Sequence, residues 1–437
     1  MDPRPLIDAI RDRKLRVGVV GLGYVGLPLV RAFVERGFRV LGFDIDRAKV
    51  EALAAGRSYI GHLSASDVAA LLVDGRFEPT ADLARLGEPD AVLICVPTPL
   101  THHREPDMTY VEGTARSIGK RLRRGQLIVL ESTTWPGTTE ELVRPILEAE
   151  SGLRCCADFL LAFSPEREDP GSRTHSLTSI PKIVGGCDAA SLEVALALYG
   201  EVAERAIAAS SPAAAEATKL IENCFRAVNI AFVNETKVLF DRMGLDVWEV
   251  IRLASTKPFG FMPFYPGPGL GGHCIPIDPF YLTWKARAFD FSTRFIELAG
   301  EINASMPYYV LERLTEAVGR SGKPLPGAKV LVLGVAYKKN VDDMRESPAV
   351  ELMELLTRRG AQVEYSDPHV PVFPPMREHR FDLRSVRLTP ESVAAYDLVL
   401  LATNHDAFDY ALVRRHARLI VDTRGVYLDP APNVVKA

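Results

Sequence analysis

The sequence predicts an α/β protein in which two doubly wound domains are joined by a long central helix. Short apolar strands alternate with helix-like stretches at the start of the chain, a long stretch without Gly or Pro follows, and the strand–turn pattern then begins again. The chain has 437 residues, which is too long for one ordinary core. We expect a first domain over residues 1–205, a central helical region over 206–320 and a second α/β domain over 321–437.

Apolar runs mark the strands of the first domain. We expect a helix over 28–35 and strands over 17–20, 39–43, 91–96 and 127–130. Runs that are apolar throughout are typical of parallel strands, because helices cover both faces of the sheet.

The central helix has a start signal and a long uninterrupted body. Ser210, Ser211 and Pro212 are typical of a helix start, and no Gly or Pro occurs over 213–243. A helix of that length would run roughly 45 Å at 1.5 Å per residue. Apolar residues recur at helical spacing: Leu220, Ile221, Cys224, Phe225, Val228 and Phe232. We interpret this helix as a spine between two domains and as a dimer surface.

The second α/β domain repeats the start of the chain in outline. After a Gly- and Pro-rich linker at 322–327, VLVLG at 330–334 parallels VGVVG at 17–21, and Asp367 parallels Asp44. The turn at Gly334 lacks the second glycine of the first domain, and its longer loop carries Lys338, Lys339 and Arg345. With Arg424, these cations suit a diphosphate, although an exposed basic loop would look the same.

Composition limits the classes of function. Hydrophobic residues make up 47% and charged residues 25%, with no apolar run long enough to cross a bilayer. The charged residues 1–14 lack the apolar core of a signal peptide, so we expect a cytoplasmic protein. A net charge of −4 argues against nucleic-acid binding, and the six cysteines show no metal spacing. We expect no metal site and mostly free thiols.

The clearest cofactor motif is G-x-G-x-x-G at Gly21, Gly23 and Gly26, with Tyr24 and Val25 between the last two glycines. It follows a strand and precedes a helix, where glycines let a pyrophosphate approach the helix N-terminus. Asp44 ends the next strand, where a carboxylate binds ribose hydroxyls and repels a 2′-phosphate, so NAD is favoured over NADP. Arg47 leaves NADP open, and a glycine turn without a ligand is the alternative.

Polar residues follow several predicted strands. Pro97 and Thr98 follow one strand, and Ser132 and Thr133 follow another, which would place them on the nicotinamide side. Glu166, in a polar loop after an apolar run, could hold a catalytic water or a substrate hydroxyl. Plain turns or caps and a solvated acidic loop are the alternatives.

Lys219 and Asn223 lie four residues apart on the long helix and therefore share a face. Together they could donate to a sugar oxygen and stabilise an alkoxide. A solvated helix flank is the alternative.

The strongest local signal is the stretch 266–278, PGPGLGGHCIPID, in which four glycines precede Cys274. Glycines let the backbone pack close to a ligand, and a thiolate is a good nucleophile toward an aldehyde. Asp278 lies four residues further on. A thiohemiacetal could pass on a second hydride, and water would release a carboxylate from the thioester. A buried cysteine, or a metal held by His273 and Cys274, is the alternative.

The order of GLGYVGLPL, CVPTPL, FSPE, EATKLIEN, GPGLGGHCIPID and GVAYKKNVDDMRESP resembles the UDP-glucose/GDP-mannose dehydrogenase family over nearly the whole chain. The resemblance implies an N-terminal NAD-binding domain, a central dimerisation region and a C-terminal nucleotide-sugar domain. It also implies oxidation of a C6 alcohol to a carboxylate with two NAD per sugar. The catalytic residues it implies are Cys274, Lys219, Asn223, Asp278, Glu166 and Thr133.

The resemblance also implies the binding residues. For the cofactor it adds Lys49, Pro97, Thr98, Thr133 and Arg345 to the glycine turn and Asp44. For the substrate it implies Glu166, Lys219, Asn223, Lys257, Gly271, Lys338 and Arg424.

Within the family, TKPFGF at 256–261 and GGHCIPIDPFYLTWKAR are most similar to members that act on UDP-N-acetylglucosamine. Members that act on UDP-glucose usually carry Lys where this chain has Ile277, and usually lack a His at position 273. UDP-N-acetylmannosamine is the close alternative substrate. A two-electron hydroxyacid-type dehydrogenase and a non-catalytic nucleotide-sugar sensor are the alternative functions.

Overall fold

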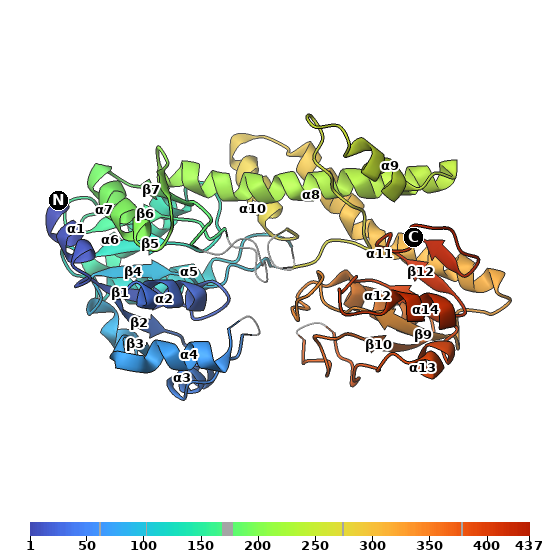
Figure 1. Cartoon of the computed structure of the whole chain (residues 1–437). Helices are drawn as coiled ribbons and strands as arrows, with labels where there is room; N and C mark the ends of the chain where they lie inside the picture. The colour runs from blue at the N-terminus through green and yellow to red at the C-terminus, as the bar shows by residue number, and fades with distance from the viewer. Residues whose placement is uncertain (61–62, 102, 168–177, 273–274, 377–378) are drawn as a thin grey trace. The chain divides into compact units, whose positions relative to one another are not determined.

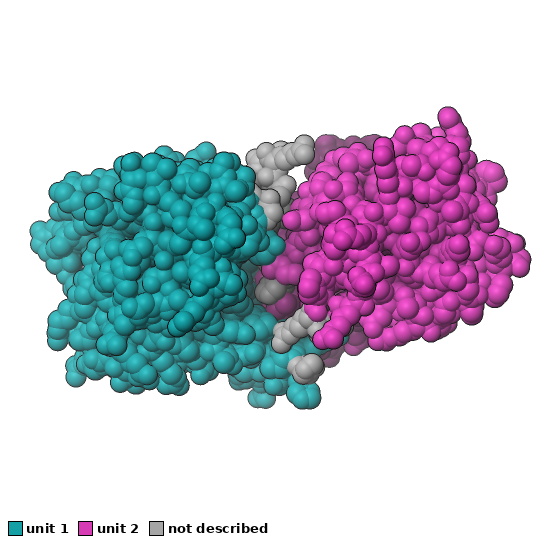
Figure 2. All heavy atoms as spheres, turned by 90° about the horizontal axis from the view of Figure 1, so that it is seen from below, with its two compact units in different colours: residues 1–222, 280–291 teal, residues 223–279, 292–437 magenta. Residues whose placement is uncertain are grey.

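The structure is a computed structural model that describes residues 1–437 except 61–62, 102, 168–177, 273–274 and 377–378. It divides into two compact units (Figure 2). Unit 1 comprises residues 1–222 and 280–291, and unit 2 comprises residues 223–279 and 292–437. The boundary falls inside the long helix α8, so that helix contributes residues to both units.

Unit 1 is built on an eight-stranded sheet with the order β3-β2-β1-β4-β5-β6-β7-β8 (Figure 1). Neighbouring strands are parallel except β6 and β7, which are antiparallel. The strands are β1 (Arg16–Val20), β2 (Arg39–Phe43), β3 (Phe77–Thr80), β4 (Ala91–Ile94), β5 (Leu127–Leu130), β6 (Leu160–Phe163), β7 (Lys182–Gly186) and β8 (Ala206–Ala208).

Helices cover this sheet, and its central strands are buried throughout. Helix α2 packs on β1 and β2, and α7 packs on β5 to β8. Every residue of β4, β5 and β6 is buried, as expected for strands covered on both faces. The helices are α1 (Arg4–Arg11), α2 (Gly26–Glu35), α3 (Arg47–Ala54), α4 (Ala65–Leu72), α5 (Thr109–Gly119), α6 (Arg144–Ser151), α7 (Ala189–Gly200) and α10 (Asp278–Ala286), with short turns η1 (Val73–Gly75), η2 (Leu83–Gly87), η3 (Thr139–Val143) and η4 (Arg287–Phe289).

The predicted strands and helix of unit 1 are present, with small shifts at their ends. Strands over 39–43 and 127–130 are found as predicted, and the helix predicted from residue 28 begins at Gly26. The strand predicted over 91–96 ends at Ile94. Pro97 and Pro99 lie just beyond it, and a proline has no N–H to donate to a neighbouring strand.

Unit 2 holds a five-stranded, fully parallel sheet with the order β10-β9-β11-β12-β13. Its strands are β9 (Lys329–Leu333), β10 (Gln362–Ser366), β11 (Leu398–Leu401), β12 (Ile420–Asp422) and β13 (Val434–Lys436). Its helices are α9 (Val247–Ala254), α11 (Arg294–Arg320), α12 (Pro348–Arg358), α13 (Pro390–Ala394) and α14 (Tyr410–His416), together with the second part of α8.

Alternate residues of β9 belong to two different cores. Val330 and Val332 pack in one cluster, and Leu331 and Leu333 pack in another. Successive side chains of a strand point to opposite faces, so both faces of this sheet are covered. The prediction of two doubly wound domains is therefore confirmed.

Helix α8 (Pro212–Met243) spans 32 residues, starting where the sequence predicts. The Ser211 hydroxyl caps its start by accepting a hydrogen bond from the backbone N–H of Ala214 at 3.1 Å. The apolar positions divide: Leu220 and Cys224 are buried, whereas Phe225 and Phe232 are exposed. In the described parts of the chain, no helix is long and apolar enough to span a membrane.

Candidate active site

The turn between β1 and α2 needs glycine at three positions for three reasons. Gly21 has φ +94°, and an added Cβ would lie 2.6 Å from the carbonyl oxygen of Cys95. At Gly26 an added Cβ would lie 1.8 Å from the carbonyl oxygen of Gly21, so only glycine lets the helix pack this close to the turn. At Gly23 no described atom lies within 4 Å of that position, so a ligand can reach the backbone. Tyr24 and Val25 are half-buried beside it. This turn fits the pyrophosphate of a dinucleotide.

Asp44 is held where β2 ends and faces this turn. Its Oδ2 accepts a hydrogen bond from the backbone N–H of Leu22 at 3.0 Å, and its Oδ1 accepts one from Asp46 at 2.9 Å. The ammonium of Lys49 lies 3.7 Å from the same carboxylate. An oriented carboxylate at this point suits the ribose hydroxyls of NAD. Arg47, which left NADP open, is the exposed first residue of α3.

Sequence reasoning missed a third side chain at this turn. The hydroxyl of Tyr59 donates to the carbonyl oxygen of Leu22 at 2.5 Å. Burial and the nearby Asp44 carboxylate raise the pKa of Tyr59, so the phenol keeps its proton and stays a donor.

The strand ends at 97–98 and 132–133 are fixed by their own hydrogen bonds. The Ser132 hydroxyl donates to the carbonyl oxygen of Val96 at 2.7 Å, and the hydroxyl of Tyr281 donates to that of Thr98 at 2.9 Å. Thr133 is half-buried and Pro97 is exposed. Tyr281 lies on α10, so residues that follow the cysteine loop help to hold this edge of the sheet.

A buried charge network at the same edge was also missed. The ammonium of Lys182, the first residue of β7, lies 2.7 Å from Oε2 of Glu131 and 3.1 Å from Oε2 of Glu166. The hydroxyl of Tyr199 donates to the other oxygen of Glu131. Because β7 runs antiparallel to β6, its first residue lies at the edge where β5 and β6 end. Glu166, predicted to hold water or substrate, is thereby anchored to a cation.

Burial alone would lower the pKa of Lys182, but the two carboxylates raise it well above its usual value. Lys182 therefore remains an ammonium ion over the whole working range of pH. A charged residue before the apolar run Ile183-Val184 was the available signal in the sequence.

Lys219 and Asn223 share the face of α8 that the sequence predicts, and both are buried. The amide nitrogen of Asn223 donates to the carboxylate of Asp278, and Arg226 donates to the amide oxygen of Asn223. Lys219 is 8% exposed and has no hydrogen-bond or ion-pair partner within the described part of the chain. The structure therefore brings together Asn223 and Asp278, which the family resemblance groups as catalytic.

Cys274 and His273 lie outside the described residues. Cys224, beside Asn223 on α8, is described, and burial followed by the charge of Asp278 raises its pKa to about 12. That thiol stays protonated at neutral pH, so it does not compete as a nucleophile. The five described cysteines are all free, and no metal-binding group of His, Cys, Asp or Glu occurs among the described residues.

The glycines before Cys274 are in close contact with protein atoms. An added Cβ would lie 2.6 Å from a guanidinium nitrogen of Arg424 at Gly267, and 2.6 Å from Cβ of Tyr337 at Gly271. The backbone N–H of Gly272 donates to the carbonyl oxygen of Arg345 at 3.0 Å. Glycine is therefore needed here so that the loop can pack against the segments that carry the predicted substrate residues.

The predicted cations of unit 2 lie in different surroundings. Lys338 lies over the ring of Tyr337 at 5.7 Å, and Arg345 pairs with Asp343 at 2.6 Å. Nε of Arg424 donates to the carbonyl oxygen of Ala402 at 2.6 Å. Burial lowers the pKa of Arg424 to about 10, which leaves it cationic at neutral pH. Lys257 is exposed and lies over the ring of Phe259, so the structure does not group it with the others.

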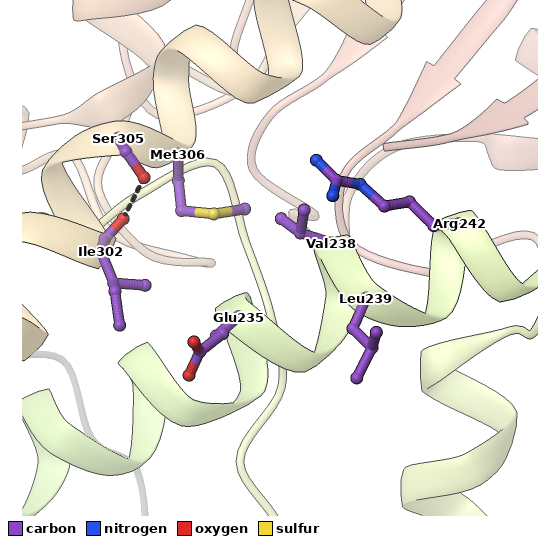
Figure 3. A pocket seen from close by; sticks show the side chains of 7 residues that line it. All are labelled: Glu235, Val238, Leu239, Arg242, Ile302, Ser305 and Met306. Carbon is purple, nitrogen blue, oxygen red and sulfur yellow. Dashed lines mark hydrogen bonds between the residues drawn. The ribbon is translucent and has the colours of Figure 1, made fainter.

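A cavity of about 290 Å³ lies elsewhere in unit 2, between α8 and α11 (Figure 3). None of the predicted site residues lines it. Its lining residues are Glu235, Val238, Leu239, Arg242, Ile302, Ser305 and Met306.

The glycine turn and Asp44, at the edge of the mostly parallel sheet of unit 1, are typical of a dinucleotide-dependent dehydrogenase. Comparison with known proteins gives the family. The UDP-glucose/GDP-mannose dehydrogenase family matches through its NAD binding domain at residues 15–203, its central domain at 213–305 and its UDP binding domain at 331–430. The chain belongs to this family, and it is an NAD-dependent nucleotide-sugar dehydrogenase.

Individual relatives match over nearly their whole length. A UDP-N-acetyl-D-glucosamine 6-dehydrogenase of Pseudomonas aeruginosa is 38% identical, over 91% of this chain and 92% of the relative. A UDP-N-acetyl-D-mannosamine dehydrogenase of Escherichia coli is 34% identical, over 94% of this chain and 99% of the relative. The solved structure of a UDP-D-ManNAc dehydrogenase from Pyrococcus horikoshii is 31% identical with a TM-score of 0.86, over 97% of this chain and 98% of that one.

Proposed function

We propose that the protein oxidises the C6 hydroxyl of UDP-N-acetylglucosamine to the carboxylate, through a thiohemiacetal and a thioester on Cys274. The observation that carries the proposal is the buried hydrogen bond between Asn223 and Asp278. It joins the helix face that holds Lys219 to the residue four positions after Cys274. Groups that can stabilise an alkoxide and activate water are thereby tied to the segment that holds the nucleophile.

The turn of Gly21, Gly23 and Gly26 would hold NAD, and two NAD bound there in succession would each take one hydride from C6. In the first oxidation, the ammonium of Lys219 and the amide of Asn223 stabilise the C6 alkoxide. The thiolate of Cys274 then adds to the aldehyde carbon. After the second oxidation, Glu166 and Asp278 hold the water that cleaves the thioester, which releases the carboxylate and regenerates the thiol.

We propose the sugar from local sequence motifs and from the overall identity to a relative. The stretch at 256–261, His273 and Ile277 are most similar to enzymes for UDP-N-acetylglucosamine, and a relative with that activity is 38% identical. UDP-N-acetylmannosamine, which differs in configuration at C2, is the second candidate, because a relative named for it is 34% identical.

The test is NADH formation against UDP-N-acetylglucosamine, UDP-N-acetylmannosamine and UDP-glucose. We expect the highest kcat/KM with the first, and two NADH per sugar consumed. One NADH per sugar with accumulating aldehyde would reject the covalent second step. Tight UDP-sugar binding without NADH over hours would instead indicate a sensor.

Cys274→Ser tests the nucleophile, and Cys224→Ser is the matched control. The first variant should bind NAD and substrate but lose turnover, because an unactivated hydroxyl is a much weaker nucleophile than a thiolate. The control should retain activity, since its thiol stays protonated. Full activity in Cys274→Ser would remove this residue from the mechanism.

We also propose that the protein is a cytoplasmic homodimer that pairs through α8. Five large apolar side chains of α8 are at least half exposed: Ile221, Phe225, Phe232, Leu239 and Met243. An exposed apolar stripe of this kind is typical of an interface. A monomer in light scattering at working concentration would contradict this assembly.

A further inference from the structure

Asp367 occupies in unit 2 the position that Asp44 occupies in unit 1. Each residue directly follows the second strand of its sheet, and each accepts a hydrogen bond from the turn after the first strand. The backbone N–H of Leu22 donates to Asp44 at 3.0 Å, and the backbone N–H of Val335 donates to Asp367 at 2.8 Å. The two domains thus share one local design.

The surroundings of the two carboxylates differ. The ring of His405 lies against Asp367, with Nε2 at 3.0 Å from Oδ2, and both side chains are completely buried. Backbone N–H groups of His369 and Val370 also donate to Asp367, at 2.8 and 3.2 Å. This carboxylate is therefore enclosed by protein donors and is not open to a ribose.

The hydrogen bonds fix the protonation of His405. Its Nδ1 lies 2.9 Å from the backbone nitrogen of Asn340. A backbone N–H only donates, so Nδ1 is the acceptor and carries no proton. The proton is on Nε2 and is donated to Asp367. His405 thus joins the strand-end carboxylate to residue 340.

The segment 403–406 holds the basic loop on both sides of Lys338. Two residues before it, the carbonyl oxygen of Ala336 accepts from the Thr403 hydroxyl at 2.6 Å. Two residues after it, Asn340 bonds His405 and exchanges two hydrogen bonds with Asp406, at 2.6 and 3.0 Å. Asn340 has φ +63°, an unfavourable conformation for a residue other than glycine, so these bonds are what keep it there.

We propose that His405 is a positioning residue that, through Asn340, sets the place of Lys338 in the substrate site. The proposal rests on the proposed function, in which Lys338 contacts the nucleotide-sugar. Tyr337, the residue before Lys338, packs against Gly271 of the cysteine loop. The hydrogen bonds of residues 403–406 therefore also help to hold the segment on which that loop packs. Loss of the Nδ1 acceptor of His405 would release the loop at residue 340. This would weaken UDP binding and leave NAD binding unchanged.

Three variants of the full-length protein separate the two bonds of the ring. His405→Asn keeps an acceptor near the position of Nδ1, His405→Gln keeps a donor near that of Nε2, and His405→Leu keeps neither. Binding of UDP and of NAD is measured by titration calorimetry. NAD binding reports that unit 1 is folded, and cooperative urea unfolding reports that unit 2 is folded. His369→Ala is the matched control, because that ring lies beside His405 but is exposed.

We expect His405→Leu and His405→Gln to bind UDP about tenfold more weakly, as for one lost hydrogen bond, with NAD affinity unchanged. His405→Asn and His369→Ala should bind UDP like the native protein. Native UDP affinity in folded His405→Leu would overturn the inference alone. If unit 2 of the Leu variant does not unfold cooperatively, equal UDP affinity in the Asn and Gln variants would overturn the inference. Failure of the native protein to bind UDP would overturn the proposed function as well.

Discussion

Nζ of Lys182 lies 3.1 Å from Oε2 of Glu166, and the two side chains are only 3% and 13% exposed. The same ammonium holds Glu131 at 2.7 Å. One buried cation therefore balances two carboxylates, at the edge of the sheet where the candidate catalytic residues of unit 1 gather.

Replacing Lys182 by an uncharged residue should lower the stability of the folded protein. Lys182→Met removes the ammonium that two little-exposed carboxylates both contact, so we expect the free energy of unfolding to fall by about 3–5 kcal/mol. Urea unfolding at neutral pH measures this. Lys14→Met is the control, because Lys14 pairs with Asp12 on the surface, and it should unfold like the native protein. Equal stability of Lys182→Met and the native chain would contradict the network.

Alanine substitutions at two glycines of the β1–α2 turn should have different effects, one on stability and the other on NAD binding. Gly26→Ala places a Cβ 1.8 Å from a backbone oxygen, so it should destabilise unit 1 even without a ligand. At Gly23 the added Cβ meets no described atom, so Gly23→Ala should melt like the native protein but bind NAD at least about tenfold more weakly.

Thermal melting and NAD titration separate these two outcomes. Gly113→Ala, within α5 and with open space at its Cβ, should be stabilised by about 1 kcal/mol. If Gly23→Ala binds NAD normally, the pyrophosphate does not lie against this turn.

Asp44 should set the choice between NAD and NADP. Asp44→Ser removes the carboxylate that would bind the ribose and repel a 2′-phosphate, while Arg47 and Lys49 remain nearby. The ratio of kcat/KM for NAD to that for NADP should fall about tenfold or more. Asp46→Ser is the control, because serine can still cap α3 there. The same fall in both variants would assign the preference to the loop as a whole.

Sequence reasoning worked best where chemistry is local. The three glycines of the first turn and the aspartate that follows β2 lie within 24 residues, and each is tied to a strand–turn–helix pattern. The grouping of Asn223 with Asp278, 55 residues apart, came only from the family resemblance.

The network around Lys182 shows why the rest could not be predicted. Its members are 16 and 51 residues from Lys182, and they meet only because β7 runs antiparallel to β6. Nothing in the short apolar run of β7 reveals its direction. The sequence indicates Asp367 as a strand-end carboxylate, but its contact with His405 was missed for the same reason, since that contact depends on the order of β10, β9 and β11.

The carboxylate of Asp367 should make unfolding depend on pH in a defined direction. Burial raises its pKa, but the hydrogen bonds from His405 and the backbone lower it by more, so the net shift is downward. A lowered pKa in the folded state stabilises the fold fully above the ordinary value of about 3.9, and that stability is lost as the pH falls through the folded value.

Asp367→Asn should therefore be less stable than the native protein at neutral pH, by about 1–3 kcal/mol, because an amide nitrogen then faces backbone N–H donors. The difference should narrow as the native carboxylate gains its proton below about pH 4. Urea unfolding at both pH values measures it. Asp429→Asn, at an exposed position, should match the native protein throughout. A difference for Asp367→Asn that stays constant with pH would mean that the amide disturbs packing, and that the charge itself contributes nothing.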